Sequence, residues 1–394
     1  MPKTGISLIL ILILGTTESC KQHHFRSTDY NYSKPQQTGD SLETGVMYNF
    51  GMDTTKIVQL TKLILADSFP DIHSLLILKQ NKLIYENYFA GDDEIVGQGS
   101  VGYIDHTIDS LHDCRSVTKS FTSACIGIAI KKGFIKNVNE PIYPWFPEYA
   151  EYFDSTKRKI TILDLLTMTS GLEWNGTASS NSKNTESQME TSPNPIRFIL
   201  SRPMAAEPGK QWNYSGGDAQ LLGEILWKAS GVKLDKFAQM NLFAPLGIKK
   251  YEWLTQIKDM PSAAWGLRLR SRDLAKFGLL YINNGRWNNI QILDSSWVEQ
   301  SLRPLVPRSK EKMTNLGYGL LFWTYSIVIG KDTLNISEAY GKGGQIISIC
   351  KPLNLVVVFT SGNYNRNDFV NTYFMALKKY ILPSIKVREK EEAD

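Results

Sequence analysis

The sequence predicts an α+β fold in which both ends of the chain build one antiparallel sheet, flanked by helices, with a mostly helical insert between them. Strand patterns gather at residues 75–89 and 318–360, whereas helical spacing dominates the long stretch that separates them. Strands separated in this way can complete a single sheet. A composition of 42% hydrophobic and 21% charged residues is typical of a soluble globular protein and excludes a disordered chain or a polytopic membrane protein.

The N-terminus has the pattern of an export signal. Lys3 precedes an apolar run at 6–14, which is too short to span a bilayer. Cys20 follows, and the small residue Ser19 before it resembles the cleavage site of a bacterial lipoprotein, in which Cys20 becomes lipidated. We therefore expect an exported protein, periplasmic or anchored to a membrane through Cys20, with ordinary secretion as the alternative.

The domain layout follows from composition. Residues 21 to about 45 are polar and resemble a flexible tether. The predicted units are a signal peptide at 1–19, the tether at 20–45, and one large domain at 46–394 with a helical insert at about 135–310.

The individual elements follow from local periodicity. Residues 75–79 and 83–89 flank Gln80-Asn81-Lys82 and predict a β-hairpin. Further strands are predicted at 318–329, 345–350 and 355–360. Helical spacing predicts helices at 57–68, 115–132, 162–168, 218–230, 234–243, 271–283, 295–302 and 368–381.

The segment 173–194 is expected to be a long loop. Ser, Thr and Asn fill 12 of its 22 positions. A loop of this length inside a compact domain is either functional or mobile, and we expect it to border the substrate cleft.

Charge and cysteine content exclude several classes of protein. The net charge is +5 and the basic residues are scattered, whereas a nucleic-acid binder concentrates them. Without Cys20, an odd set of cysteines remains, which gives no disulfide framework. These are Cys114, Cys125 and Cys350. No CxxC spacing occurs, which excludes zinc ribbons and thioredoxin-like chemistry.

Histidine placement restricts the catalytic chemistry. All five histidines precede residue 113, so the Ser, Asp/Glu, His order of α/β-hydrolases fails for any later serine. They are His23, His24, His73, His106 and His112. No HExxH or Walker A motif occurs. A serine hydrolase here would need a base other than histidine.

The Ser116-Val117-Thr118-Lys119 sequence supplies such a base. Ser-x-x-Lys places both side chains on one helix face, and a lysine can act as a base when it is neutral. The tetrapeptide also occurs four more times, but only Ser116 opens a long apolar helix. The other serines are Ser180, Ser230, Ser309 and Ser348. The alternative role for Ser116 is that of a helix N-cap.

Two further segments carry candidate site residues. Tyr214 lies in a Gly-flanked turn before a helix, where a phenol could shuttle a proton. The run 341–345, Gly-Lys-Gly-Gly-Gln, precedes an apolar strand, where glycines let a substrate approach the backbone. Taken singly, each segment also fits a structural aromatic residue or a glycine turn.

Together the three segments resemble the penicillin-recognising serine hydrolases: class C β-lactamases, D-alanyl-D-alanine carboxypeptidases and related esterases. The likeness runs from about 70 to 382 and implies a β-lactamase/transpeptidase-like fold. One position departs from the family pattern, because Gly216 stands where the tyrosine box usually has Asn. This puts β-lactam hydrolysis in doubt and is more similar to the branch that contains 6-aminohexanoate-dimer hydrolase.

The resemblance assigns a role to each candidate residue. It implies that Ser116 forms the acyl-enzyme, that Lys119 helps to deprotonate it, and that Tyr214 shuttles the proton. Lys342 would supply positive field. The oxyanion hole would be the backbone N–H groups of Ser116 and Gln345, beside Gly343 and Gly344. The resemblance implies no metal and no organic cofactor.

The function expected from these patterns is an exported serine hydrolase that acts on esters or amides of small molecules. A D-alanyl-D-alanine carboxypeptidase or a β-lactamase is the alternative enzyme. A catalytically silent binding or sensing lipoprotein is the alternative from another class. The expected partners are a small-molecule ester, amide or peptide and, through Cys20, a membrane, with no nucleic acid; the oligomeric state is left open.

Overall fold

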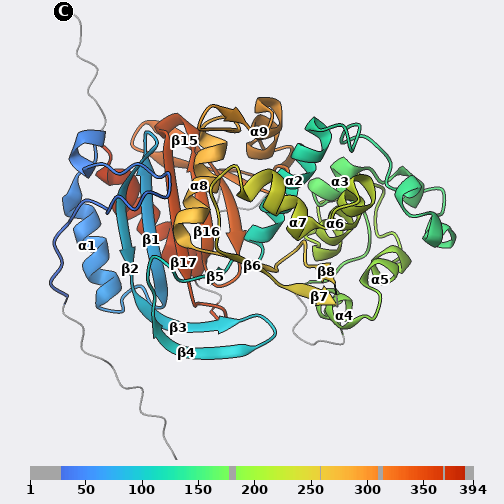
Figure 1. Ribbon diagram of the computed structural model, residues 1–394, viewed down its shortest axis with the longest axis horizontal. Helices are drawn as coiled ribbons and strands as arrows, with labels where there is room; N and C mark the ends of the chain where they lie inside the picture. The colour runs from blue at the N-terminus through green and yellow to red at the C-terminus, as the bar shows by residue number, and fades with distance from the viewer. Residues whose placement is uncertain (1–27, 177–182, 258, 309–313, 367–368, 387–394) are drawn as a thin grey trace, which may run out of the picture.

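A computed structural model describes residues 28–176, 183–257, 259–308, 314–366 and 369–386 (Figure 1). The predicted signal peptide and Cys20 lie outside these residues. The central element is an eight-stranded sheet in the order β12-β13-β14-β15-β16-β17-β1-β2, with every neighbouring pair antiparallel. Its strands are β1 (Ile72–Lys79), β2 (Lys82–Tyr88), β12 (Val306–Pro307), β13 (Thr314–Tyr318), β14 (Trp323–Ile329), β15 (Asp332–Gly341), β16 (Gln345–Cys350) and β17 (Leu355–Ser361).

Both chain ends contribute to this sheet, as the sequence predicts. The predicted hairpin forms, and Gln80 and Asn81 at its turn have φ values of 49° and 65°. Two successive left-handed residues match the right-handed twist of the flanking strands. On its other side β1 pairs with β17, so that Ile77 lies opposite Val357.

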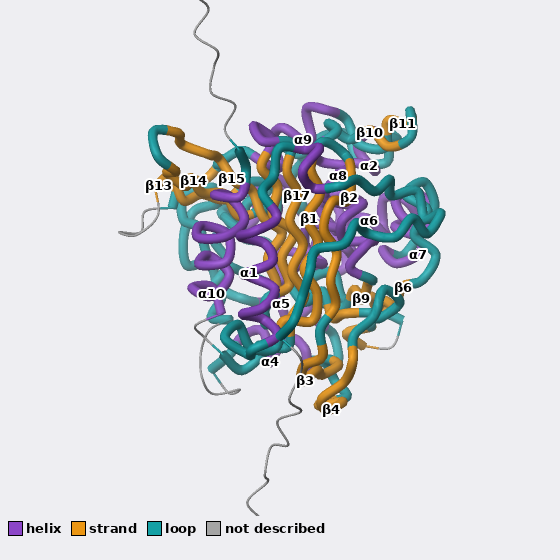
Figure 2. Tube along the Cα trace, turned by 90° about the vertical axis from the view of Figure 1, so that its left-hand side faces the viewer, coloured by secondary structure: helices purple, strands orange, loops and turns teal. Residues whose placement is uncertain are grey.

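The two faces of the sheet are covered by different helices (Figure 2). One face packs on α1 (Thr54–Leu65) and on the C-terminal helix, α10 (Phe369–Ala376) continued by η7 (Leu377–Ile381). The other face packs on α2 (Val117–Lys131) and α8 (Ser271–Ile282). Alternate residues of each strand therefore enter different cores: Ile77 faces α1, whereas Leu76 and Leu78 face α8 and α2.

The region between β2 and β12 is rich in helices, and it contacts α2 from the side away from the sheet (Figure 1). The helices are α3 (Ile162–Leu166), α4 (Thr185–Thr191), α5 (Pro195–Ser201), α6 (Gly216–Ser230), α7 (Leu234–Ala238) and α9 (Ser295–Leu302). The same region also contains short strands that are not part of the eight-stranded sheet. These are the hairpin β3 (Ala90–Ile95) and β4 (Gly99–Asp105), the set β5 (His112–Asp113), β9 (Leu267–Leu269) and β6 (Tyr251–Trp253), and the pairs β7 (Thr255–Ile257) with β8 (Met260–Pro261) and β10 (Arg286–Trp287) with β11 (Ile290–Gln291).

Several local predictions differ from the structure. The predicted strand at 318–329 is divided in two, because β13 ends at Tyr318 and β14 begins at Trp323. The segment 173–194 is not wholly a loop, because α4 forms within it and Asn184 caps that helix by accepting from the Ser187 amide. The ten-residue strand β15 and the hairpin β3–β4 have no counterpart in the predicted strands.

In the part of the chain that the structure describes, no helix is long and apolar enough to cross a membrane.

The two ends of the domain meet beside α1. The Lys386 amide donates to the Gly51 carbonyl at 2.8 Å, and the Asp53 amide donates to the Ser384 carbonyl at 2.7 Å. The segment before α1 and the segment after the C-terminal helix are therefore joined by backbone hydrogen bonds.

Candidate active site

Ser116 lies at the N-terminus of α2, and its side chain makes no capping hydrogen bond there. The preceding residue, Arg115, has φ of 50°, a left-handed conformation that is uncommon for a residue with a side chain. This turn leaves the hydroxyl of Ser116 available for chemistry. The helix amides that follow are satisfied, since Val117 donates to Cys114 at 3.1 Å.

Lys119 lies one helical turn further on, directly beneath Ser116. Its Nζ lies 3.1 Å from the Ser116 Oγ and donates to the Ala264 carbonyl at 3.0 Å. The lysine is 3% exposed, and in the described residues no carboxylate lies within ion-pair distance of it. A buried amine fixed by a backbone carbonyl and in contact with a hydroxyl is positioned to exchange a proton with that hydroxyl.

Tyr214 brings the third candidate to the same place. It lies just before α6, whose first turn is capped by the Ser215 side chain, and its ring lies 4.9 Å from the Lys119 Nζ. Its ring also stacks on Trp323, with centroids 5.7 Å apart and planes at 28°. The structure thus brings Ser116, Lys119 and Tyr214 together from α2 and from the start of α6.

An aromatic wall continues from Tyr214. Trp212 lies edge-on to Trp323, with ring centroids 5.6 Å apart, and the Arg308 guanidinium covers the Trp212 ring at 3.5 Å. Aromatic rings give a substrate a broad apolar contact surface with little conformational freedom to lose.

The glycine-rich run forms the tight turn between β15 and β16. Gly343 and Gly344 have φ values of 85° and 96°, which favour glycine. A Cβ atom on Gly341 would lie 2.4 Å from the Cys114 carbonyl oxygen, so the end of β15 packs against the segment that carries Ser116. Gln345 is buried and begins β16.

Lys342 is placed differently from the other candidates. It is exposed in the turn, and among the described residues no hydrogen bond or ion pair joins its ammonium to Ser116, Lys119 or Tyr214. Any influence on the reaction would be a field acting across the turn, and its assigned role stays a prediction.

Glu186 is a site residue that the sequence reasoning missed. Its carboxylate accepts from the Gly216 amide at 3.1 Å and from the Trp174 indole N–H at 3.0 Å. A Cβ atom on Gly216 would lie 1.7 Å from a Glu186 oxygen. The carboxylate therefore occupies the space that a side chain at position 216 would need. The feature of the sequence that could have indicated Glu186 is Gly216, which stands where the tyrosine box of the family usually has Asn.

Glu190 adds a second carboxylate on α4. Although the residue is exposed, burial of its carboxyl group, followed by the charge of Glu186, raises its pKa to about 7, while Lys119 and Arg115 act in the opposite direction. The helix that formed within the predicted loop therefore sets two acidic groups beside the cluster.

Asp218 supports the first turn of α6 from inside the protein. It is fully buried and accepts from the Ser170 hydroxyl at 2.8 Å. Burial raises its pKa to about 8, so the folded protein holds this carboxyl protonated at neutral pH.

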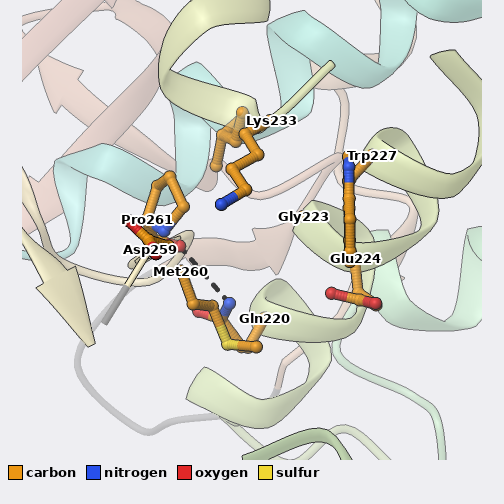
Figure 3. Close-up of a pocket in the computed structure, with 9 residues that line it drawn as sticks. Gln220, Gly223, Glu224, Trp227, Lys233, Asp259, Met260 and Pro261 are labelled. Carbon is orange, nitrogen blue, oxygen red and sulfur yellow. Dashed lines mark hydrogen bonds between the residues drawn. The ribbon is translucent and has the colours of Figure 1, made fainter. Parts of the chain in front are cut away.

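One cavity of the described residues is separate from this cluster. It has a volume of about 180 Å³, lies along α6 and is lined by none of the three clustered residues (Figure 3). Its lining includes Gln220, Glu224, Trp227, Lys233 and Pro261. The polar contacts of Ser116, rather than this hollow, identify the candidate active site.

The other Ser-x-x-Lys matches lack this setting. Ser230 ends α6 and donates to the Leu226 carbonyl, and Ser348 lies within strand β16. Ser180 and Ser309 lie outside the described residues.

Comparisons with known proteins bear on the family and the fold of this chain. A "Putative D-alanyl-D-alanine carboxypeptidase" of Salmonella heidelberg is 23% identical over 262 residues, which is 63% of this chain and 59% of that relative, so the match spans well under two thirds of its length. The solved structure of a "Putative 6-aminohexanoate-dimer hydrolase from Bacillus anthracis" has a TM-score of 0.62 at 20% identity and covers 80% of this chain and 82% of its own.

A second solved structure, a "putative beta-lactamase from Bacteroides dorei", has a TM-score of 0.63 at 19% identity and covers 82% of this chain and 98% of its own. At these identities the structures establish the fold alone, the β-lactamase/transpeptidase-like fold that the resemblance implied. The family model described as Beta-lactamase matches residues 73–379, most of the chain. The chain belongs to the Beta-lactamase family.

Proposed function

We propose that this protein is an exported serine hydrolase that cleaves ester or amide bonds of small molecules through an acyl-enzyme on Ser116. The observation that carries the proposal is the 3.1 Å contact between the Lys119 Nζ and a Ser116 Oγ that does no capping. Membership of a family of hydrolases supports the same reaction class.

The proposed first step is attack of the Ser116 Oγ on the substrate carbonyl. Lys119 accepts the hydroxyl proton, and the carbonyl oxygen becomes an oxyanion. The N–H groups of Ser116 and Gln345 are the proposed donors to that oxyanion. When the tetrahedral intermediate collapses, Tyr214 passes the proton held by Lys119 to the leaving alcohol or amine, so that Lys119 is neutral again before water attacks.

The second step reverses these roles on water. Tyr214 and Lys119 together take a proton from a water molecule, which attacks the acyl carbon. The bond to the Ser116 Oγ breaks, and the serine regains its proton. Every proton is moved by side chains of this chain.

The surroundings of Tyr214 support small esters and amides over β-lactams. The resemblance to class C β-lactamases implies that their Asn in the tyrosine box holds the side-chain amide of the antibiotic. Here a carboxylate, that of Glu186, occupies this space instead. The aromatic wall of Trp212 and Trp323 suits an apolar acyl or leaving group.

The test is pre-steady-state release of p-nitrophenol from a short-chain p-nitrophenyl ester. We expect a burst followed by turnover in the wild type and no burst in Ser116→Ala. Ser230→Ala is the matched control, because Ser230 also begins a Ser-x-x-Lys match but lies at the far end of α6. Equal slow release from the wild type and Ser116→Ala would refute the proposal and favour a silent binding protein.

Comparing the turnover of the ester with that of two other substrates distinguishes the alternative enzymes. Faster turnover of a D-alanyl-D-alanine peptide than of the ester would replace the proposal with a carboxypeptidase, the activity named for the Salmonella relative. Faster turnover of nitrocefin would indicate a β-lactamase.

A further inference from the structure

Three histidines from separate segments meet beneath the strand that leads to Ser116. His73 lies on β1, His106 follows β4, and His112 lies on β5. They are 0%, 5% and 1% exposed. The rings of His73 and His106 stack with centroids 3.8 Å apart, and the centroids of His106 and His112 are 5.0 Å apart.

Their nitrogens are almost all without hydrogen-bond partners. Among the described residues, five of the six ring nitrogens make no hydrogen bond: the Nδ1 of His73 and both nitrogens of His106 and of His112. A buried polar atom left unpaired costs about 1–3 kcal/mol. Three adjacent histidines in this condition call for a group that satisfies them together.

The sixth nitrogen shows how one ring is oriented. The Nε2 of His73 lies 3.0 Å from the Asp92 carbonyl oxygen. A carbonyl only accepts, so Nε2 carries the hydrogen and Nδ1 keeps its lone pair. Backbone carbonyls orient metal-binding imidazoles in this way.

Packing around His73 holds that orientation. A Cβ atom on Gly362 would lie 2.7 Å from the His73 Nε2 and 1.8 Å from the Asp92 oxygen. Only a glycine at position 362 allows the ring and the carbonyl to meet.

The spacing and charge state of the cluster suit a metal ion. One nitrogen from each ring can be chosen so that all three lie within 4.8 Å of one another. A point equidistant from three atoms 4.8 Å apart lies about 2.8 Å from each, against about 2.0–2.1 Å for a Zn–N bond. Each ring would therefore move inward by less than about 1 Å, and His73 and His106 would also turn out of their stack, because a metal ion lies in the plane of the imidazole that binds it. A neutral imidazole keeps one lone pair on its ring, and this is the form that binds a metal ion.

We propose that His73, His106 and His112 form a structural site for a divalent transition-metal ion of the zinc type, which ties β1, the end of the β3–β4 hairpin and β5 together. Three neutral imidazoles are a donor set that Zn²⁺ favours. Asp93 and Asp105 act on His106 as negative charges and would offset part of the ion's charge. The buried Asp113 is committed to Arg268, at 2.6 Å, and is not counted as a ligand.

The site is separate from the proposed hydrolysis. The ion would touch neither Ser116 nor Lys119, and its role would be to fix β5, which leads through Cys114 and Arg115 to the nucleophile. Loss of the ion would be measured as lower stability, whatever the activity of the enzyme.

The experiment uses the untagged chain, stripped with a chelator and titrated with Co²⁺ and then Zn²⁺. We expect one Co²⁺ per chain, with the intense visible absorption of a four-coordinate site in which a water molecule completes the three imidazoles, and we expect Zn²⁺ to displace it. His106→Phe keeps a ring stacked on His73 but removes one ligand, and should weaken binding about 100-fold or more. The double variant His23→Ala/His24→Ala is the control and should bind as the wild type does.

A second readout does not require His106→Phe to fold. Excess Zn²⁺ should raise the Tm of the metal-stripped wild type and of the His23/His24 control equally, because it binds only the native state. The proposal fails if the wild type neither binds Co²⁺ nor gains stability with Zn²⁺. It also fails if folded His106→Phe binds as tightly as the wild type, or if the His23/His24 variant loses binding.

Discussion

Tyr214 is the residue whose role can be isolated most cleanly. Its ring stacks on Trp323 and lies against the Lys119 Nζ, and a phenylalanine ring would keep both contacts. Only the hydroxyl is specific to proton transfer. Removing the hydroxyl oxygen of Tyr214 would therefore test its chemical role while leaving the packing of its ring unchanged.

We predict that Tyr214→Phe folds as the wild type does but loses about 10²–10⁴-fold in turnover, the usual contribution of a general acid–base group. Turnover of the p-nitrophenyl ester measures the loss, and thermal unfolding checks the fold. Turnover within a few-fold of the wild type would contradict the assigned role.

Asp218 makes stability depend on pH. Its pKa is about 8 in the folded protein, against 3.8 for an ordinary aspartate. Between these values the unfolded chain has lost the proton that the native state keeps. Because the native state binds more protons, its stability falls as pH rises from about 4 to about 8.

We predict that Asp218→Asn removes this dependence. The free energy of unfolding of the variant, relative to the wild type, should rise by up to about 1.4 kcal/mol per pH unit across that window. Urea unfolding of both proteins at pH 5 and pH 8 measures the difference. Parallel pH profiles would show that Asp218 is not held protonated.

At the scale of elements, α4 and the first turn of α6 depend on each other. The Glu186 carboxylate on α4 can accept from the Gly216 amide only because position 216 has no side chain. The helix and the glycine are therefore one unit, although 30 positions separate them in the sequence.

We predict that Gly216→Ala lowers the free energy of unfolding by about 1–3 kcal/mol, because it displaces Glu186 from two hydrogen bonds. In a Glu186→Ala background the same change should be neutral or slightly stabilising, since Ala favours a helix over Gly by about 1 kcal/mol. Denaturant unfolding of the four proteins gives the coupling. Additive effects would mean that the two residues do not compete for the same space.

Elements with strong periodicity were predictable, and elements built on tertiary contacts were not. The helix after Ser116 and the hairpin around Asn81 follow from local pattern. Strand β15 was missed because its Glu338 is polar yet buried, accepting from the Tyr325 hydroxyl at 2.5 Å and from Tyr373. That network joins β14, β15 and α10, and no local window contains it.

The site shows the same division. The spacing of Ser116 and Lys119 on one helix turn could be read from the sequence, and so could the turn that carries Tyr214. The exposure of Lys342 and the insertion of Glu186 depend on how a strand turn and a distant helix are packed. The histidine positions were visible, but their convergence was not, because β1, β4 and β5 bring them together only in the fold.

At the scale of the whole molecule, we propose that a lipid on Cys20 holds the domain at a membrane. The described residues begin at 28, after Cys20, and we expect lipidation to leave the fold of these residues intact.

We predict that Cys20→Ala moves the protein from the membrane fraction to the soluble fraction and abolishes labelling with a radioactive fatty acid. Cys350→Ala is the matched control and should keep both, since Cys350 is a buried thiol on β16. An unlabelled, soluble wild type would show instead that Cys20 carries no lipid.

The pairing of the first long strand with the last governs how the chain folds as it is made. β1 leaves the ribosome long before its partner β17, since the paired residues Ile77 and Val357 are 280 positions apart. Until β17 appears, Leu75 to Leu78 present an apolar, unpaired edge that invites aggregation. The sheet therefore closes only after β17 has been made. If the chain is exported as we propose, it gains from this delay, because it stays unfolded for as long as a chaperone shields that edge.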